Sequence, residues 1–370
     1  ASDVYKRQVL GGTGAMGIHV VKILSQQGHH VFCTSRIKRK QERNITYIVG
    51  DAHDMIFMQS LLNERYYKAI IDFMTYTTSD FRIRHEILLG ATDQYFFLSS
   101  SRVYADDSII TEDSPLILDT VEDKKYLKTD EYALCKARQE AILKRSGQKN
   151  FTIIRPYITY SENRLQLGVF DKDTFIYRAL KGRPIVVSDD IMQHITTLTY
   201  GYDVATCIVR LIGNAKAFGE AFHITVGQSI SWHDVLEVYM DALGKYLGKR
   251  PDVVVINQCH QLNYPIRCYQ VTYDRLYDRR FDNSKILDAI GDFTFTLPKE
   301  GLAKCIDSFL NNLSFGHIDE SIEGTNDYYS GCWASLSEYN SIKRKLRYMV
   351  YRLNPIMACR LEQRIRKFLR

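Results

Sequence analysis

The chain has 370 residues, 45% of them hydrophobic and 25% charged, and its formal net charge is +6. This composition is sufficient for a full hydrophobic core, in one large domain or in two interleaved domains. The longest apolar runs, such as residues 184–187, have only the length of a strand, so no membrane-spanning helix is expected.

The eight cysteines are scattered without a C-x-x-C pair, and no apolar secretory segment opens the sequence. These features predict a reduced, cytoplasmic compartment and no metal site. The positive charge is concentrated at one end. Ten basic residues and one acid give residues 341–370 a net charge of +9, which leaves −3 for the rest of the chain.

Residues 1–8 place charged side chains where a first strand should be apolar. We interpret them as a non-native leader and leave them out of the functional argument.

A glycine-rich turn follows Val9-Leu10 and precedes a helical pattern that runs to about Gln27. Its spacing is Gly-x-x-Gly-x-x-Gly. In such a turn the first glycine permits the bend, the second lets the backbone approach phosphates, and the third lets helix and strand pack closely. The N–H groups at the start of the helix would bind a dinucleotide pyrophosphate. The residues expected to do so are Gly11, Thr13, Gly14, Ala15, Met16 and Gly17.

A second strand over residues 30–34 ends at Ser35 and Arg36. An NAD-selective protein would place an acid here to hold the ribose 2′-OH, whereas Arg36, followed by basic residues 38–40, suits a 2′-phosphate. The sequence therefore favours NADP(H) over NAD. The alternative is a solvated basic turn.

Further strands are expected over residues 46–49, 69–72 and 94–98, with helices between them. This alternation predicts an α/β fold, a Rossmann-type doubly wound parallel sheet. Ligands bind outside the carboxyl ends of such strands. We therefore expect four residues at the strand ends to border the cofactor: Asp51, Ala52, Phe73 and Met74.

Candidate catalytic residues follow the fifth strand. Ser99, Ser100 and Ser101 lie at its end, and Tyr132 and Lys136 are spaced i, i+4 on a helix that runs to about Arg145. A lysine ammonium beside a phenol lowers the phenol pKa from about 10, which makes Tyr132 a feasible acid/base at neutral pH. A serine hydroxyl could hold the substrate oxygen in the same network.

Together these motifs resemble the extended short-chain dehydrogenase/reductase superfamily, the NAD-dependent epimerase/dehydratase type, over residues 9–300. The resemblance implies an enzyme that acts on a sugar or nucleotide sugar. Ser100 is then the catalytic serine and Tyr132 the acid/base, while Lys136 supports Tyr132 and binds the nicotinamide ribose. Pro156 belongs to the nicotinamide pocket, and Ser99 and Tyr132 belong to the cofactor site.

The sequence departs from the family pattern where sugar dehydratases carry Asp-Glu after the catalytic hydroxyl, because Ser101-Arg102 stand there. Dehydration is therefore not expected, which leaves epimerisation or net oxidation or reduction. A different class of protein is the alternative: a non-catalytic NAD(P)-binding regulatory or RNA-binding protein on the same fold.

Residues 9–160 are expected to form the cofactor domain, 161–315 an interleaved substrate domain, and 316–340 a connector with little periodicity. The candidate substrate residues are Ser101, Tyr157, Arg164, Gln166 and Gln193.

Residues 341–370 are expected to form a basic tail, helical from Ser341 and interrupted at Asn354-Pro355. Its second part has an apolar stripe formed by Leu361, Ile365, Phe368 and Leu369. Such a helix can lie on an anionic membrane, which would make the protein membrane-peripheral, or it can pack on its own domain or on a partner subunit in a homodimer. Nucleic acid is not an expected partner, because the tail lacks a reader motif.

Overall fold

The computed structural model describes residues 6–262 and 268–368. The chain divides into two units, each assembled from three separate segments. Unit 1 contains residues 1–161, 197–229 and 279–298, and unit 2 contains residues 162–196, 230–278 and 299–370. The chain thus passes between the units several times, as an interleaved arrangement requires.

Unit 1 is built on a seven-stranded sheet with the order β13-β6-β5-β4-β1-β2-β3. Every neighbouring pair is parallel. The strands are β1 (Lys6–Leu10), β2 (His30–Ser35), β3 (Ile45–Val49), β4 (Ala69–Asp72), β5 (Tyr95–Leu98), β6 (Phe151–Pro156) and β13 (Glu220–Ile224). This order confirms the predicted Rossmann-type doubly wound sheet.

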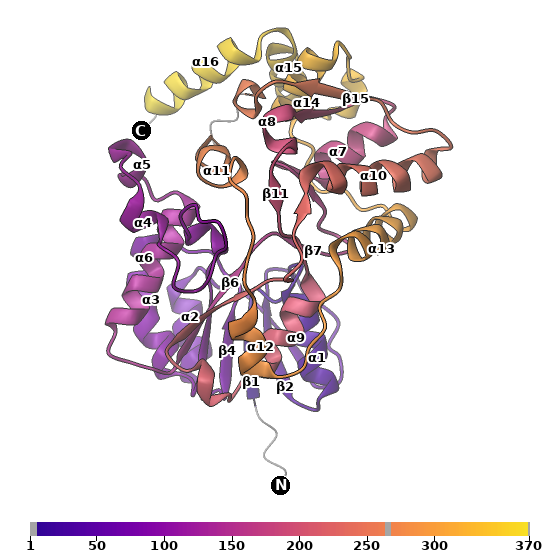
Figure 1. Ribbon diagram of the computed structural model, residues 1–370. Coiled ribbons are helices and arrows are strands. Elements are labelled where there is room, and N and C mark those ends of the chain that lie inside the picture. Colours follow the sequence, from indigo (N-terminus) through magenta and orange to yellow (C-terminus); the bar gives the residue numbers. More distant parts are fainter. Residues whose placement is uncertain (1–5, 263–267, 369–370) are drawn as a thin grey trace. The chain divides into compact units, whose positions relative to one another are not determined.

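Helices cover both faces of this sheet (Figure 1). On one face lie α1 (Gly17–Gln26), α9 (Gly201–Leu211) and α12 (Ser284–Ile290), and on the other lie α2 (Met55–Asn63), α3 (Thr78–Gly90) and α6 (Tyr132–Arg145). Successive strand residues enter opposite cores: Val9 packs with the first set of helices and Leu10 with the second. The shorter elements of unit 1 are η1 (Ser101–Val103), α4 (Ile117–Thr120), α5 (Lys124–Leu127), β7 (Thr159–Tyr160), β12 (Thr199–Tyr200) and η2 (Ala215–Ala217).

The first strand begins earlier than the sequence suggested. Lys6 pairs with His30, and Arg7 pairs with both Val31 and Ala69. Gln8 is fully buried. The boundary proposed at residue 8 therefore falls inside β1, because backbone pairing tolerates polar side chains that the hydrophobic pattern would reject. Residues 1–5 lie outside the described residues.

Unit 2 is a mixed assembly of helices and two-stranded sheets. Its elements are β8 (Gln166–Leu167), β9 (Phe170–Asp171), α7 (Lys172–Leu180), β10 (Ile185–Ser188), α8 (Asp189–Met192), β11 (Ile195–Thr196), β14 (Ile230–Ser231), α10 (Trp232–Leu247), β15 (Val253–Ile256), η3 (Cys259–Leu262), α11 (Cys268–Gln270), η4 (Val271–Arg275), α13 (Pro298–Asn311), α14 (Glu320–Ser330), η5 (Leu336–Glu338), α15 (Ile342–Leu353) and α16 (Pro355–Phe368). The strand pair β10-β15 is parallel, and β11-β14 and β8-β9 are antiparallel.

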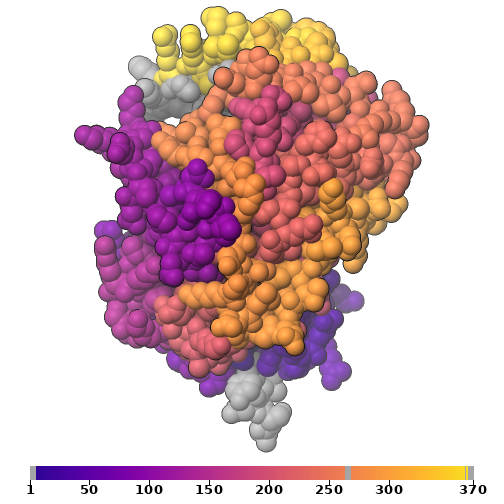
Figure 2. Space-filling view, viewed as in Figure 1, coloured from indigo at the N-terminus to yellow at the C-terminus, as the bar shows by residue number. Residues whose placement is uncertain are grey.

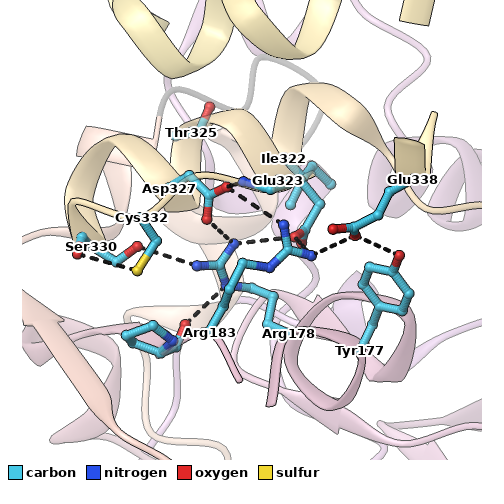
Figure 3. Close-up of polar contacts among 12 residues, drawn as sticks. Tyr177, Arg178, Arg183, Ile322, Glu323, Thr325, Asp327, Ser330, Cys332 and Glu338 are labelled. Atoms are coloured by element: carbon cyan, nitrogen blue, oxygen red, sulfur yellow. Dashed lines mark hydrogen bonds and ion pairs between the residues drawn. The ribbon is translucent and has the colours of Figure 1, made fainter. Parts of the chain in front are cut away.

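The expected connector over residues 316–340 instead contains the helix α14, which is held by buried ion pairs. Arg178 Nη1 lies 2.8 Å from Asp327 Oδ1 and 3.1 Å from Glu323 Oε2, and all three side chains are buried. Arg183 joins the cluster through Glu323 and Glu338 (Figure 3). Because the buried face of α14 is charged, the spacing of apolar residues in the sequence does not predict this helix.

The tail is helical as predicted. Ser341 caps α15 by accepting a hydrogen bond from Arg344 N, and the helix ends at Leu353. After Asn354, α16 begins at Pro355, where proline is tolerated in the first turn.

Candidate active site

The turn between β1 and α1 is shaped by its glycines. Gly11 has a φ of +66°, in the left-handed region, and its N–H donates to Thr34 Oγ1 at 3.0 Å. A Cβ atom on Gly17 would lie 2.7 Å from the Gly12 Cα atom. The start of α1 therefore packs directly on the turn, and a larger residue at position 17 would force them apart.

Gly14 has different surroundings. A Cβ atom on Gly14 would meet no other atom within 4 Å, and Thr13 and Gly14 are both exposed. The N-terminus of α1 has no side-chain cap at Met16. Because N–H groups and the helix dipole favour an anion at such a terminus, the turn fits a dinucleotide pyrophosphate.

The residues after β4 lie against the same turn. A Cβ atom on Gly11 would lie 2.8 Å from Met74 Sδ, and Phe73 N donates to Leu10 O at 3.0 Å. From the other side, Gly201 at the start of α9 approaches Ala15, since a Cβ atom there would lie 3.0 Å from the Ala15 carbonyl oxygen. The strand order reverses between β1 and β4, which is where open α/β sheets bind their ligands.

Ser35 and Arg36 end β2 and differ in exposure. Ser35 is buried, and its Oγ donates to Ile37 O at 2.9 Å while accepting from Arg39 Nε at 3.3 Å. Arg36 is exposed. Ser35 therefore shapes the loop, and Arg36 is an accessible cation at this strand end, as are Lys38 and Lys40.

Asp51 lies at the end of the neighbouring strand β3, close enough to Arg36 for their charges to interact. Hydrogen bonds from the His53 backbone and side chain lower the pKa of Asp51, and the charge of Arg36 acts in the same direction. Ala52 is buried, and its carbonyl accepts from Arg84 Nη1 at 3.1 Å. An acid and a base thus both border the position expected for the adenosine ribose.

Lys136 is in α6, and its side chain reaches the carboxyl end of β5. The residue is 2% exposed, and Nζ donates to Leu98 O at 2.7 Å. The same Nζ lies 6.0 Å from the centroid of the Tyr132 ring. Burial lowers the pKa of Lys136 to about 8, and the negative charge of Asp72 opposes that shift. The ammonium therefore remains the main form at pH 7, next to the phenol.

Tyr132 is the first residue of α6 and is 39% exposed. The Arg102 guanidinium lies 5.6 Å from its ring centroid, and Arg102 is paired with Glu131 at 2.8 Å. Glu131 caps the helix by accepting from Ala133 N. Two cationic side chains thus lie near the ring, which remains accessible to a ligand.

The three serines after β5 have separate contacts. Ser99 Oγ donates to Glu140 Oε1 at 2.5 Å, and Ser101 Oγ donates to Arg155 O at 2.8 Å. Ser100 Oγ accepts from Arg102 N at 3.2 Å. This bond uses Ser100 as an acceptor, so its hydroxyl proton can be donated to a substrate oxygen. Ser101, a predicted substrate residue, is fully buried in the structure.

Buried charges that the sequence analysis did not single out support this site. Asp72, at the end of β4, accepts from Tyr95 OH at 2.8 Å and from Met74 N at 2.9 Å, and burial raises its pKa. The pair Arg155–Glu140 is buried, with Arg155 Nη2 2.6 Å from Glu140 Oε2. The only sequence signal was an acid or a base within an apolar strand or helix. Their partners are distant in the chain.

Two candidates follow or end β6. Pro156 pairs with Ile224 at the edge of the sheet. Tyr157 is buried, and its ring centroid lies 5.2 Å from that of Phe281.

Unit 2 contains the remaining substrate candidates. Arg164 and Gln166 line a cavity of about 370 Å³ together with Asn163, Leu165, Val169, Asp171, Lys172, Asp173 and Gln270. Gln193 is not among the lining residues and donates to Asp189 Oδ2 at 2.6 Å. The structure therefore brings together two of the three candidates in this unit.

The chain belongs to the NAD dependent epimerase/dehydratase family, whose sequence profile matches residues 8–227. This match includes the glycine turn, the serines after β5, and both Tyr132 and Lys136.

Three relatives illustrate the likeness. The chain is 28% identical over 272 residues to the chloroplast stem-loop binding protein of 41 kDa b from Arabidopsis thaliana, covering 70% of this chain and 67% of that protein. The Bordetella bronchiseptica enzyme WbmH, solved with NAD+, is 17% identical with a TM-score of 0.64, over 83% of this chain and 99% of WbmH. UDP-glucose 4-epimerase from Thermotoga maritima, solved with UDP-glucose, is 16% identical with a TM-score of 0.61, over 84% of this chain and all of that one. Both structural similarities concern the fold.

Proposed function

We propose that the protein is an NAD(P)-dependent oxidoreductase or epimerase that transfers hydride at a carbinol or keto carbon of a sugar or nucleotide sugar. The observation that carries this proposal is the buried Lys136 ammonium, bound to Leu98 O at the end of β5 and adjacent to the accessible Tyr132 ring. A non-catalytic cofactor-binding protein has no need for an ammonium held next to an accessible phenol.

Each side chain has a distinct role in the proposed oxidation. Tyr132, as phenolate, removes the proton of the substrate hydroxyl while hydride leaves the same carbon. The positive charge of Lys136 stabilises the phenolate, and Ser100 donates a hydrogen bond to the substrate oxygen and fixes its position. The nicotinamide supplies the hydride acceptor when bound. In the reverse direction Tyr132 returns the proton.

NADP(H) is the proposed cofactor, with NAD as the alternative. Support comes from the exposed Arg36 at the end of β2, which can bind a 2′-phosphate by charge-assisted hydrogen bonds. Asp51 lies close enough to reduce that advantage. The Arg36→Asp variant should shift the ratio of NADP to NAD affinity toward NAD by at least about tenfold. An unchanged ratio would mean that Arg36 is a solvated side chain.

The proposed substrate is a nucleotide sugar, since the related 4-epimerase was solved with UDP-glucose. The test is product analysis with UDP-glucose and other nucleotide sugars. An epimer without net cofactor change indicates epimerisation, and a keto sugar with one equivalent of reduced cofactor indicates oxidation. No product with any sugar or nucleotide sugar would contradict the proposal.

RNA binding is the second candidate function, because one relative is named for stem-loop binding. The net charge of −3 outside the tail does not favour it. Salt-dependent binding of stem-loop RNA, combined with no cofactor-dependent turnover, would establish this function in place of the enzymatic one.

A further inference from the structure

The tail helix α15 is part of unit 2 and packs against α14 through its polar and aromatic face. Tyr348 and Tyr351 are buried, and Tyr348 OH donates to Asp327 Oδ2 at 2.8 Å. Gly324 allows the close approach, since a Cβ atom on it would lie 2.6 Å from Tyr348 O. Arg344 Nε donates to Glu320 Oε2 at 3.0 Å. The hydrogen bonds between α15 and α14 are therefore made by the polar side chains of α15.

The opposite face of α15 is apolar and exposed. Ile342, Leu346, Val350 and Leu353 recur every three or four residues and are 76%, 56%, 46% and 63% exposed. In α16 the exposed large hydrophobic side chains are Ile356, Met357, Leu361 and Ile365, and each is at least 44% exposed. The two helices, yellow in Figure 2, are at the surface of unit 2. Phe368 and Leu369 lie beyond the side chains that the structure describes.

This apolar face has a basic border. Lys343, Lys345, Arg360 and Arg364 take part in none of the ion pairs formed by the described residues. Trp333 is 55% exposed, and the Arg352 guanidinium lies 4.4 Å from its ring. Tryptophan, basic side chains and exposed aliphatic side chains together are typical of a surface that meets lipid headgroups.

We propose that α15 and α16 bind the surface of an anionic lipid bilayer, with the apolar face in the headgroup region and the basic side chains on anionic lipids. The helices would lie in the membrane plane, because no helix among the described residues has the length and apolar content to cross a bilayer. An anionic bilayer can bury the apolar side chains and also attract the net charge of +9 carried by residues 341–370. In a symmetric dimer, two such positive faces would meet and repel.

Vesicle flotation of the full chain tests this proposal. The expected result is at least about tenfold stronger binding to vesicles of phosphatidylcholine with phosphatidylserine than to phosphatidylcholine alone, weakened by salt. Leu346→Gln combined with Leu361→Gln should reduce binding at least tenfold without changing thermal stability, since both side chains are 56% exposed. The control is Ile56→Gln, since Ile56 is an aliphatic residue of α2 that is 79% exposed.

A second pair of variants separates charge from apolar contact. Lys343→Glu with Arg360→Glu should abolish the preference for anionic vesicles, whereas Lys245→Glu with Lys249→Glu in and after α10 changes the net charge equally and should not. Equal effects of the two pairs would overturn the proposal. Two other results would overturn it. In one, the wild type binds no vesicles and Leu346→Gln with Leu361→Gln dissociates a dimer. In the other, the tail binds RNA and no lipid.

Discussion

Gly14 and Gly17 belong to one turn, yet substitution by alanine should affect cofactor affinity at Gly14 and stability at Gly17. Gly14→Ala places a methyl group in open space, so the free energy of unfolding should change by less than about 0.5 kcal/mol while cofactor affinity falls. Gly17→Ala forces the methyl group against Gly12 and should cost about 1–3 kcal/mol. Urea denaturation and cofactor titration measure both. A loss of stability in Gly14→Ala with unchanged affinity would contradict the proposed cofactor site.

Lys136 should make activity and stability respond to pH in opposite directions. Its pKa is lowered from 10.5 to about 8, so the ammonium beside Tyr132 is lost as the pH rises through about 8, and turnover should decline there. The unfolded chain still binds that proton up to pH 10.5, so the free energy of unfolding should gain a contribution over the same interval. pH–rate profiles and denaturation at several pH values measure the two trends. Lys136→Met should show neither the decline in turnover nor the rise in the free energy of unfolding above about pH 8. A rise that persists in this variant would come from a group other than Lys136.

At the scale of single residues, the glycine turn, the strand-end serines and the Tyr132–Lys136 pair predict a site through their combination in chain order, because each spacing by itself is common. The supporting charges could not be predicted. Asp72 and the Arg155–Glu140 pair depend on partners in other strands and helices, which no local pattern encodes. The bond from the Ser101 hydroxyl to Arg155 O likewise joins residues that are distant in the chain.

Among the elements, β2 to β5 lie within one residue of their predicted bounds, whereas β1 begins earlier than predicted, at Lys6. Helix α14 was not predicted, because its inward face carries Glu323, Asn326 and Asp327 in place of aliphatic side chains. Sequence periodicity has no signal for a helix that is held by buried ion pairs, and residues 316–340 were therefore interpreted as a connector.

The ion pairs of α14 predict a large cost for Arg178→Met. Removing a guanidinium that Glu323 and Asp327 share leaves buried carboxylates without it, which costs about 3–5 kcal/mol. Arg250→Met is the matched control in the same unit. Its partners Glu237 and Asp241 are on the surface, so the cost should be about 0–1 kcal/mol. Equal costs in urea denaturation would mean that α14 does not stabilise unit 2.

For the whole molecule, the interleaving of the chain limits which fragments can fold. Unit 1 takes β13, α9 and α12 from residues beyond 196, and its core includes Ile208, Phe222 and Ile286. A fragment of residues 1–161 should therefore show no cooperative unfolding transition and should bind hydrophobic dyes. A cooperative transition in near-ultraviolet circular dichroism, matching one of the full chain, would contradict this division.

The proposed role of Tyr132 is to exchange a proton with the substrate while hydride moves to or from the nicotinamide. Its most direct test is a single-turnover measurement of nicotinamide absorbance with the nucleotide sugar on which the wild type acts. We expect a rate about 10²–10⁴-fold lower for Tyr132→Phe, with the cofactor still bound, and a wild-type rate for the surface control Tyr246→Phe. Equal rates for wild type and Tyr132→Phe would contradict it.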